Sequence, residues 1–160
     1  LDVGNTTTLA HHLALLGGAW LLAGLDKFAG DQARIRAASP KLLASNTALV
    51  SAQLSQDFLT AGAMANLGTL VESAVGAHLY NTRLPGMDLL HWRARNHEVD
   101  FIVHHGSKIM AGEVQNGRHK GVLARLQTFF PGFFRATRLV VGSGGIPLER
   151  FLSTPVEAWI

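Results

Sequence analysis

Two neighbouring segments in the second half of the chain have the apolar and polar pattern of a β-hairpin. Residues 99–105 and 108–115 are rich in β-branched and apolar side chains, and Gly106-Ser107 lies between them. Glycine at the first position of a two-residue loop is typical of a type II′ turn, which fixes how the two strands pair. The pattern therefore predicts two antiparallel strands in a defined register.

Continuing that register away from the turn places Asp100 opposite Glu113, with Cβ atoms about 5 Å apart. Alternation along the strands adds Glu98 and Gln115 to the same face. The opposite face is predicted to be apolar, formed by Val99, Phe101, Val103, Met110 and Val114. Three clustered acids repel one another unless a cation or a proton neutralises them, and oxygen ligands suit Mg²⁺ or Mn²⁺. The hairpin thus predicts a divalent metal site with Asp100 and Glu113 as ligands.

A second interpretation of the same face is an ordinary solvent-exposed surface. Its acids would then pair with Arg93, Arg95 or Lys108. A slip of the register by one residue would also place the two central carboxylates on opposite faces. The sequence pattern alone leaves both interpretations open.

The pattern around the hairpin predicts further helices and strands. The main helix covers residues 61–80, and Glu72 lies beside its apolar stripe of Leu67, Leu70, Val71, Ala74, Val75 and His78. The other predicted elements are a strand at 88–93, the hairpin strands, a helix at 122–130, a strand at 137–142 and a last strand at 155–160. The core order α-β-β-β-α-β predicts an α/β (α+β) fold with a mixed sheet and flanking helices.

The first part of the chain is predicted to form a smaller unit. A helix at 9–16, capped by Thr7 or Thr8 and ended by Gly17-Gly18, precedes two strands at 20–25 and 34–36. A helix followed by two strands resembles the end of a winged helix, which serves on DNA or as a plain connector.

Ser39-Pro40-Lys41 is predicted to interrupt this unit, and residues 46–56 to form a loop or a short helix. We therefore divide the chain into a winged-helix-like segment with its connector, residues 1–56, and a second domain, residues 57–160.

Composition narrows the class of protein. The chain has 160 residues, 48% of them hydrophobic, which is enough to bury a core as one domain or two small units. It has no cysteine, which excludes disulfides and thiolate metal sites and agrees with a reducing, cytoplasmic compartment. The longest apolar run, 14–25, is too short to cross a bilayer. A formal charge of +3 permits DNA as a partner but falls short of a dedicated nucleic-acid protein.

Several short motifs occur in a recognisable order. They are Pro40-Lys41, Gly68 with Glu72, Trp92-Arg93, Glu98-Val99-Asp100-Phe101 and Glu113-Val114-Gln115. Together they resemble the PD-(D/E)XK nuclease superfamily, and more closely a domain of unknown function found C-terminal to AAA-type P-loop ATPases of bacteria and archaea. The resemblance implies a nuclease-like core with Asp100 and Glu113 as metal ligands and Glu72 as an auxiliary carboxylate. It also implies an N-terminal ATPase domain in the same polypeptide, in keeping with a chain that begins with Leu1.

Gln115 departs from the pattern of that superfamily, which usually has lysine at this position. A lysine can orient the attacking water and offset charge developing on the phosphate, whereas an amide can hydrogen-bond but carries no charge. Some nucleases of the superfamily have Gln or Glu here, so Gln115 remains a candidate catalytic residue beside Glu72, Asp100 and Glu113.

The turn after the hairpin carries Arg118, His119 and Lys120. These residues are candidate phosphate contacts if nucleic acid binds, and the alternative is a solvated turn with ordinary charges.

Three functions follow from the sequence. The first is a nuclease-like accessory domain of an ATPase that binds DNA or another partner. The second is an active Mg²⁺-dependent DNA endonuclease, and the third is a structural interaction module in which the acids are a remnant.

Overall fold

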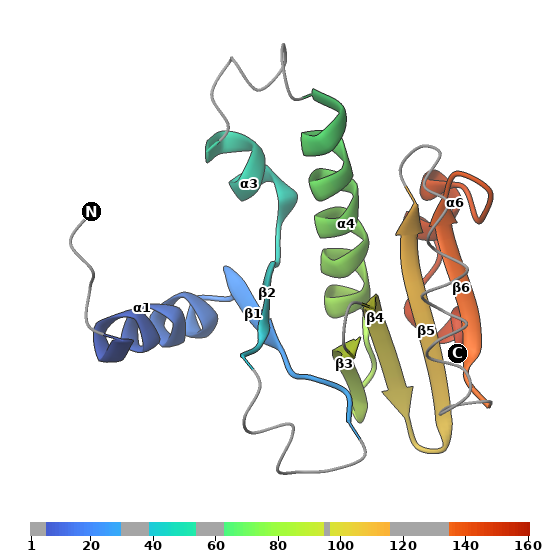
Figure 1. The fold of residues 1–160 in the computed structure, drawn as a ribbon, viewed down its shortest axis with the longest axis horizontal. Helices are drawn as coiled ribbons and strands as arrows, with labels where there is room; N and C mark the ends of the chain where they lie inside the picture. Colours follow the sequence, from blue (N-terminus) through green and yellow to red (C-terminus); the bar gives the residue numbers. More distant parts are fainter. Residues whose placement is uncertain (1–5, 30–38, 54–62, 95–96, 116–134) are drawn as a thin grey trace.

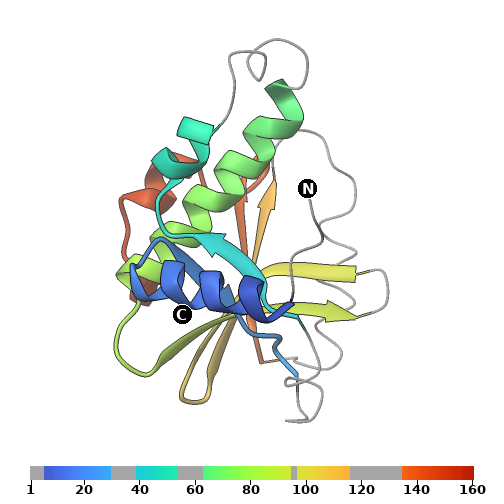
Figure 2. The ribbon, with the colours of Figure 1, turned by 90° about the vertical axis from the view of Figure 1, so that its left-hand side faces the viewer.

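The computed structural model describes residues 6–29, 39–53, 63–94, 97–115 and 135–160. Its elements follow one another as α1 (Thr6–Gly18), β1 (Leu22–Leu25), β2 (Lys41–Ala44), α3 (Thr47–Gln53), α4 (Ala63–Thr82), β3 (Met87–Ala94), β4 (His97–His105), β5 (Lys108–Gln115), β6 (Thr137–Gly142), α6 (Leu148–Leu152) and the 3-10 helix η2 (Val156–Trp159). The long helix α4 lies between the small β1–β2 pair and the main sheet (Figure 1). Figure 2 shows α1 and β2 in front of α4 when this side faces the viewer.

The main sheet has four strands in the order β3-β4-β5-β6. The first two pairings are antiparallel, and β6 runs parallel to β5, so the predicted mixed sheet with flanking helices is confirmed. The predicted hairpin register is also confirmed, from His105↔Lys108 at the turn to Phe101↔Gly112. Gly106 has φ 61°, the positive value that a type II′ turn requires at this position. The paired register ends one step before Asp100 and Glu113.

A bulge in β4 changes the predicted alternation. Leu90 pairs with Ile102, but Trp92 pairs with Val99, so two residues of β4 oppose the single residue His91 of β3. The extra residue reverses the faces of everything before it in β4. Val99 was predicted to share a face with Phe101, and this is wrong, because Val99 packs in the cluster on the other face.

Both faces of the sheet carry apolar clusters. The larger one lies on the α4 face and includes Val75, Leu79, Phe101, Val103 and Met110. The second contains Val99, Ile102 and Ala111, which are fully buried. The predicted division into one apolar and one acidic face is therefore wrong, because the face that was expected to be acidic also buries apolar side chains.

The larger cluster also joins the N-terminal unit to the sheet. Ala23 and Leu25 of β1 and Leu43 of β2 belong to it, so residues on both sides of the predicted domain boundary share one core. Gly76 of α4 lies at this junction. A Cβ atom there would meet Leu43 Cδ1 at 2.6 Å and Phe101 Cε1 at 2.8 Å, so only glycine lets α4 approach both strands this closely.

The two outer strands of the sheet each pair with a short segment. On β3, the His91 N–H donates to Asp26 O (3.0 Å), and the Phe28 N–H donates to His91 O (2.6 Å). On β6, the Ile146 N–H donates to Val140 O and the Gly142 N–H to Ile146 O, both at 2.8 Å. The contacts at His91 also connect the segment after β1 to β3 at the residue that faces the bulge of β4.

The N-terminal unit matches its prediction in part. A helix and an antiparallel two-stranded pair are present, and Leu25 pairs with Lys41. The second strand is β2, whereas residues 34–36 lie outside the described part. Pro40-Lys41 was predicted to interrupt the pattern, but Lys41 is the first residue of β2. The helix and strand pair are thus shown, and the winged-helix resemblance stays a prediction.

The C-terminal end differs from its prediction. A strand was expected at 155–160, and the structure has the 3-10 helix η2 there, preceded by the unpredicted helix α6. The apolar residues of this region serve a core contact, because the Trp159 ring stacks on Phe151 with ring centroids 5.8 Å apart. The predicted helix at 122–130 lies outside the described residues. No helix in the described ranges is long and apolar enough to cross a membrane.

Candidate functional site

A lysine from β2 lies among three carboxylates of α4 and β4. Lys41 Nζ is 2.7 Å from Glu72 Oε1, 3.4 Å from Glu98 Oε1 and 3.9 Å from Asp100 Oδ1. We call these four residues the Lys41 cluster. The cluster brings together two predicted site residues, Glu72 and Asp100, and adds Glu98 from the same strand and a cation that the sequence pattern did not assign to the site.

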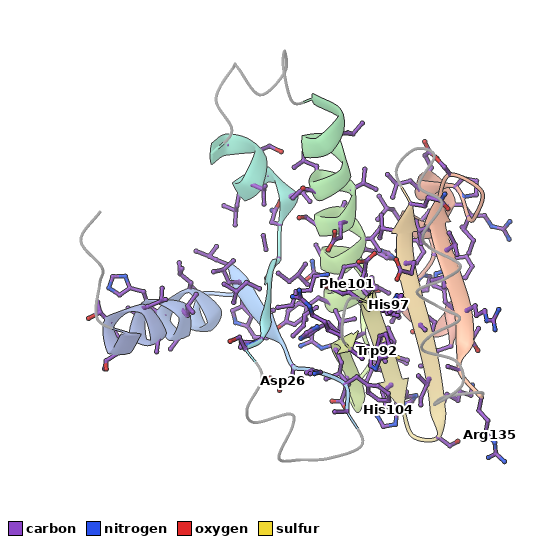
Figure 3. All side chains as sticks on the ribbon, in the orientation of Figure 1. Asp26, Trp92, His97, Phe101, His104 and Arg135 are labelled. Atoms are coloured by element: carbon purple, nitrogen blue, oxygen red, sulfur yellow. The ribbon has the colours of Figure 1, made fainter. Side chains whose placement is uncertain are left out.

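Local structure explains why these residues meet. Lys41 opens β2, and β2 packs closely on α4 at Gly76, one helical turn after Glu72. Glu98 and Asp100 flank Val99 in β4, and the bulge gives Asp100 the same face as Phe101. Phe101 is labelled in Figure 3 near the end of α4 that adjoins the sheet. Helix α4, the bulge of β4 and the start of β2 therefore bring Glu72, Asp100 and Lys41 together.

The surroundings of Lys41 favour its charged form. Burial lowers the pKa of Lys41, but the hydrogen bond with Glu72 and the charges of Glu72, Asp100 and Glu98 raise it more, so the pKa lies above 10.5. The ammonium group also lies 5.3 Å from the centroid of the Phe101 ring, a cation–π distance. With 23% of its side chain exposed, Lys41 is a largely enclosed and firmly protonated cation.

Asp100 accepts hydrogen bonds through both its side chain and its backbone oxygen. Its Oδ2 accepts a hydrogen bond from the Val114 N–H at 2.9 Å, and its backbone oxygen lies 3.5 Å from Lys41 Nζ as an acceptor. The carboxylate therefore extends the contact between β4 and β5 past the last paired residues. It is 15% exposed, so it reaches the edge of the site without being a surface acid.

Glu113 lies deeper in the sheet than predicted. Glu113 is 0% exposed, and it pairs with Val140 of β6 in the parallel register. Alternation along β5 places it on the face of Ala111, whereas Lys41 contacts the face of Phe101. The Lys41 cluster thus contains Asp100, while Glu113 belongs to the opposite face of the same sheet.

Gln115 ends β5 beside the glycine turn that follows β6. Its backbone oxygen accepts the Ser143 N–H at 3.0 Å. Gly142, with φ 101°, lies so close that a Cβ atom would overlap this oxygen, so the turn requires glycine here. Backbone contacts fix the position of Gln115 at the end of its strand.

His91 is a buried histidine that the sequence pattern did not single out. It is 6% exposed and stands opposite the bulge residues of β4. Neither ring nitrogen has a hydrogen-bond partner among the described residues. Burial lowers its pKa from 6.5; Glu98 acts in the opposite direction, and the charges of Lys41, Lys27 and Arg93 add to the lowering. A neutral imidazole therefore borders the Lys41 cluster.

The arrangement can be tested for its fit to a divalent ion. Within the described ranges, no three His, Asp or Glu side chains are grouped to hold one. Lys41 already supplies a cation within 4.0 Å of three carboxylates, and one oxygen of Asp100 accepts a backbone hydrogen bond. The donor set as arranged does not fit Mg²⁺ or Mn²⁺, because Lys41 would have to move first.

The other predicted contacts are only partly described. Arg93, an alternative partner for the acids, lies 4.0 Å from Glu98 at a strongly exposed position. Lys108 donates to Ile160 O instead. Arg95 and the predicted phosphate contacts Arg118, His119 and Lys120 lie outside the described residues. The signal for Lys41 in the sequence was Pro40-Lys41, which has a place in the motif order but no role that the sequence alone assigns.

The fold and the cluster define a mixed α+β domain with an acid site at the junction of helix and sheet. A sequence profile of the family described as a domain of unknown function (DUF4143) matches residues 67–141. This stretch runs from α4 to β6 and includes Glu72, Asp100, Glu113 and Gln115, but not Lys41. Comparison with curated proteins and with solved structures gave no significant match.

Proposed function

We propose that the chain is a nuclease-like accessory domain of a P-loop ATPase, which binds nucleic acid or a protein partner and in which Lys41 has replaced the metal as the cation of the acid site. The observation that carries the proposal is the position of Lys41 Nζ between Glu72, Glu98 and Asp100. An internal ammonium neutralises acids that would otherwise repel one another. The site then keeps its structure without an external ion.

Two further features support a binding role over cleavage. Gln115 carries no charge where the resembled nucleases usually have lysine, so it cannot offset charge on a phosphate. Glu113 of β5 lies on the sheet face opposite the Lys41 cluster, so β4 and β5 do not direct the two predicted metal ligands to one point. The ATPase context rests on the motif resemblance, which covers most of the chain.

Metal titration tests the role of Lys41. The melting temperature of the wild-type chain should not change with millimolar Mg²⁺ or Mn²⁺, because Lys41 already neutralises the acids. In Lys41→Met the same ions should raise the melting temperature, since the carboxylates lose their internal cation. Stabilisation of the wild type by metal, with none in Lys41→Met, would contradict the proposal.

Cleavage is the second candidate function, because Glu72 and Asp100 do approach one point. In that case Asp100 and Glu113 would hold Mg²⁺, Glu72 would assist and Gln115 would position the attacking water. This function requires a rearrangement that brings Glu113 to the face of Asp100. Plasmid nicking by the wild type and by Glu113→Ala decides between the two. Mg²⁺-dependent nicking that is lost in Glu113→Ala would establish cleavage, and no nicking by either protein agrees with a binding domain.

Nucleic-acid binding is separated from protein binding by its salt dependence. Filter binding of duplex DNA at two salt concentrations should show weaker retention at the higher one if phosphate contacts contribute. Absence of retention at low salt would favour the third function, a structural module that interacts with protein.

A further inference from the structure

An open pocket of about 350 Å³ lies between the end of α1 and the end of α4. Its walls include Trp20, Tyr80, Arg83, Leu84, Pro85 and Met87. Among the residues that line it, Arg83 is the only one with a formal charge. The pocket shares no residue with the Lys41 cluster, which borders a separate small cavity.

Trp20 adopts a strained backbone conformation at the edge of this pocket. The Leu21 N–H donates to Leu16 O, and the Trp20 N–H donates to Gly17 O, both at 3.0 Å, which is the Schellman pattern at the end of α1. The left-handed position of that motif usually holds glycine, but here it holds Trp20 with φ 60°. A bulky residue with positive φ is an outlier that costs free energy.

Burial does not compensate for this strain. Trp20 is 71% exposed, so its indole gains little from packing in the chain itself. Strained residues that persist without a packing reward gather at binding sites. Trp20 thus lines the pocket while most of its surface stays exposed.

Arg83 is held against Tyr80 in the lining of the pocket. Its guanidinium lies 3.6 Å from the centroid of the Tyr80 ring, and Nη1 donates to Tyr80 O at 2.6 Å. Among the described residues, no carboxylate lies within 4.0 Å of it. The guanidinium therefore offers a planar surface and an uncompensated positive charge.

We propose that this pocket binds a nucleotide unit, with its base stacked on Trp20 and its phosphate near Arg83. Bases stack on aromatic rings and on guanidinium planes, and a guanidinium pairs with phosphate oxygens. The pocket volume falls in the range of small-ligand sites. The unit is either a free nucleotide or part of a single strand. The inference does not rest on the function proposed for the Lys41 cluster.

Calorimetric titration of the 160-residue chain with AMP, with an eight-nucleotide DNA strand and with a proline-rich decapeptide tests the proposal. AMP or the strand should bind and should quench tryptophan fluorescence. A strand affinity at least about tenfold above that of AMP identifies the strand as the source of the nucleotide, and equal affinities identify the free nucleotide. Binding of the peptide alone, or of none of the three, would overturn the proposal.

Two variants separate binding from folding. Trp20→Gly places the usual residue in the left-handed position, so its melting temperature should equal or exceed that of the wild type while affinity falls at least about tenfold. Arg83→Lys keeps the charge but loses the planar stacking surface and should also bind more weakly.

Leu15→Ala, at an exposed position of α1 that does not line the pocket, is the matched control and should bind as the wild type does. If both Trp20→Gly and Arg83→Lys bind AMP and the strand with unchanged affinity, nucleotides bind elsewhere and the proposal is wrong.

Discussion

Lys41 Nζ and Glu72 Oε1 lie 2.7 Å apart and join the first residue of β2 to the middle of α4. The contact ties the N-terminal unit to the core helix through charge, next to the apolar contact that Gly76 allows. Removing the ammonium would leave three carboxylates facing one another in a partly buried position.

Lys41→Met should therefore lower the free energy of unfolding at neutral pH by about 2 kcal/mol. Urea denaturation measures this difference. Because the folded-state pKa of Lys41 lies above 10.5, its contribution is complete below that pH and is lost as the pH rises through the folded value. The gap between wild type and variant should thus narrow in strong alkali.

Lys108→Met is the control for this measurement. Lys108 is exposed, and its Nζ donates to the backbone of Ile160 at 3.3 Å. Its loss should change stability by less than about 0.5 kcal/mol. An equal loss in both variants would mean that Lys41 acts as an ordinary surface charge.

Asp100 should matter more as a hydrogen-bond acceptor than as a charge. Asp100→Asn keeps an oxygen for the Val114 N–H, whereas Asp100→Ala removes it. We expect the alanine variant to be less stable than the asparagine variant by about 1 kcal/mol. Chemical denaturation of the two proteins compares them directly, and equal stabilities would show that the hydrogen bond contributes nothing.

Gly76→Ala should destabilise the fold by about 1–3 kcal/mol, because its methyl group would overlap Leu43 and Phe101. Gly18, the last residue of α1, provides the matched control, because a methyl group added there would meet no atom within 4 Å. Thermal denaturation of both variants measures the difference, and Gly18→Ala should be neutral or slightly stabilising. A stable Gly76→Ala protein would show that α4 can move away from β2 and β4 at little cost.

Stability should depend on pH through His91. Its folded-state pKa is lowered from 6.5, mainly by burial, so its contribution is present above pH 6.5 and is lost as the pH falls through the folded value. Wild-type stability should decline on acidification in this window, and His91→Leu should flatten the decline. His12→Gln, at an exposed position of α1, should leave the curve unchanged; a curve that His91→Leu does not alter would assign the decline to other groups.

Local sequence signals predicted much of the fold. Gly106 set the turn and with it the register back to Phe101, and the apolar run at 137–142 became β6 within its predicted bounds. The main helix was placed within two residues at each end. These elements depend on short-range rules, namely turn geometry, alternation and helical periodicity.

What the sequence did not predict depends on contacts between distant segments. The bulge at Asp100 arises from pairing with β3, where the segment after β1 also joins at His91. Lys41 reaches Asp100 across 59 positions of the chain, and no local pattern encodes that distance. Trp20 was missed for another reason. Glycine is the expected residue in the left-handed position after a helix, so the sequence predicted that the first helix ends at Gly17-Gly18, before Trp20.

The short segments paired to the outer strands bear on how the protein behaves at high concentration. An open sheet offers unpaired backbone groups on its two outermost strands, and such strands recruit other chains into aggregates. Here the backbones of Asp26 and Phe28 hydrogen-bond to His91 of β3, and the backbone of Ile146 hydrogen-bonds to Val140 and Gly142 of β6. Among the described residues, each outer strand is thus paired at one position, which shortens the stretch along which a neighbouring chain could extend the sheet.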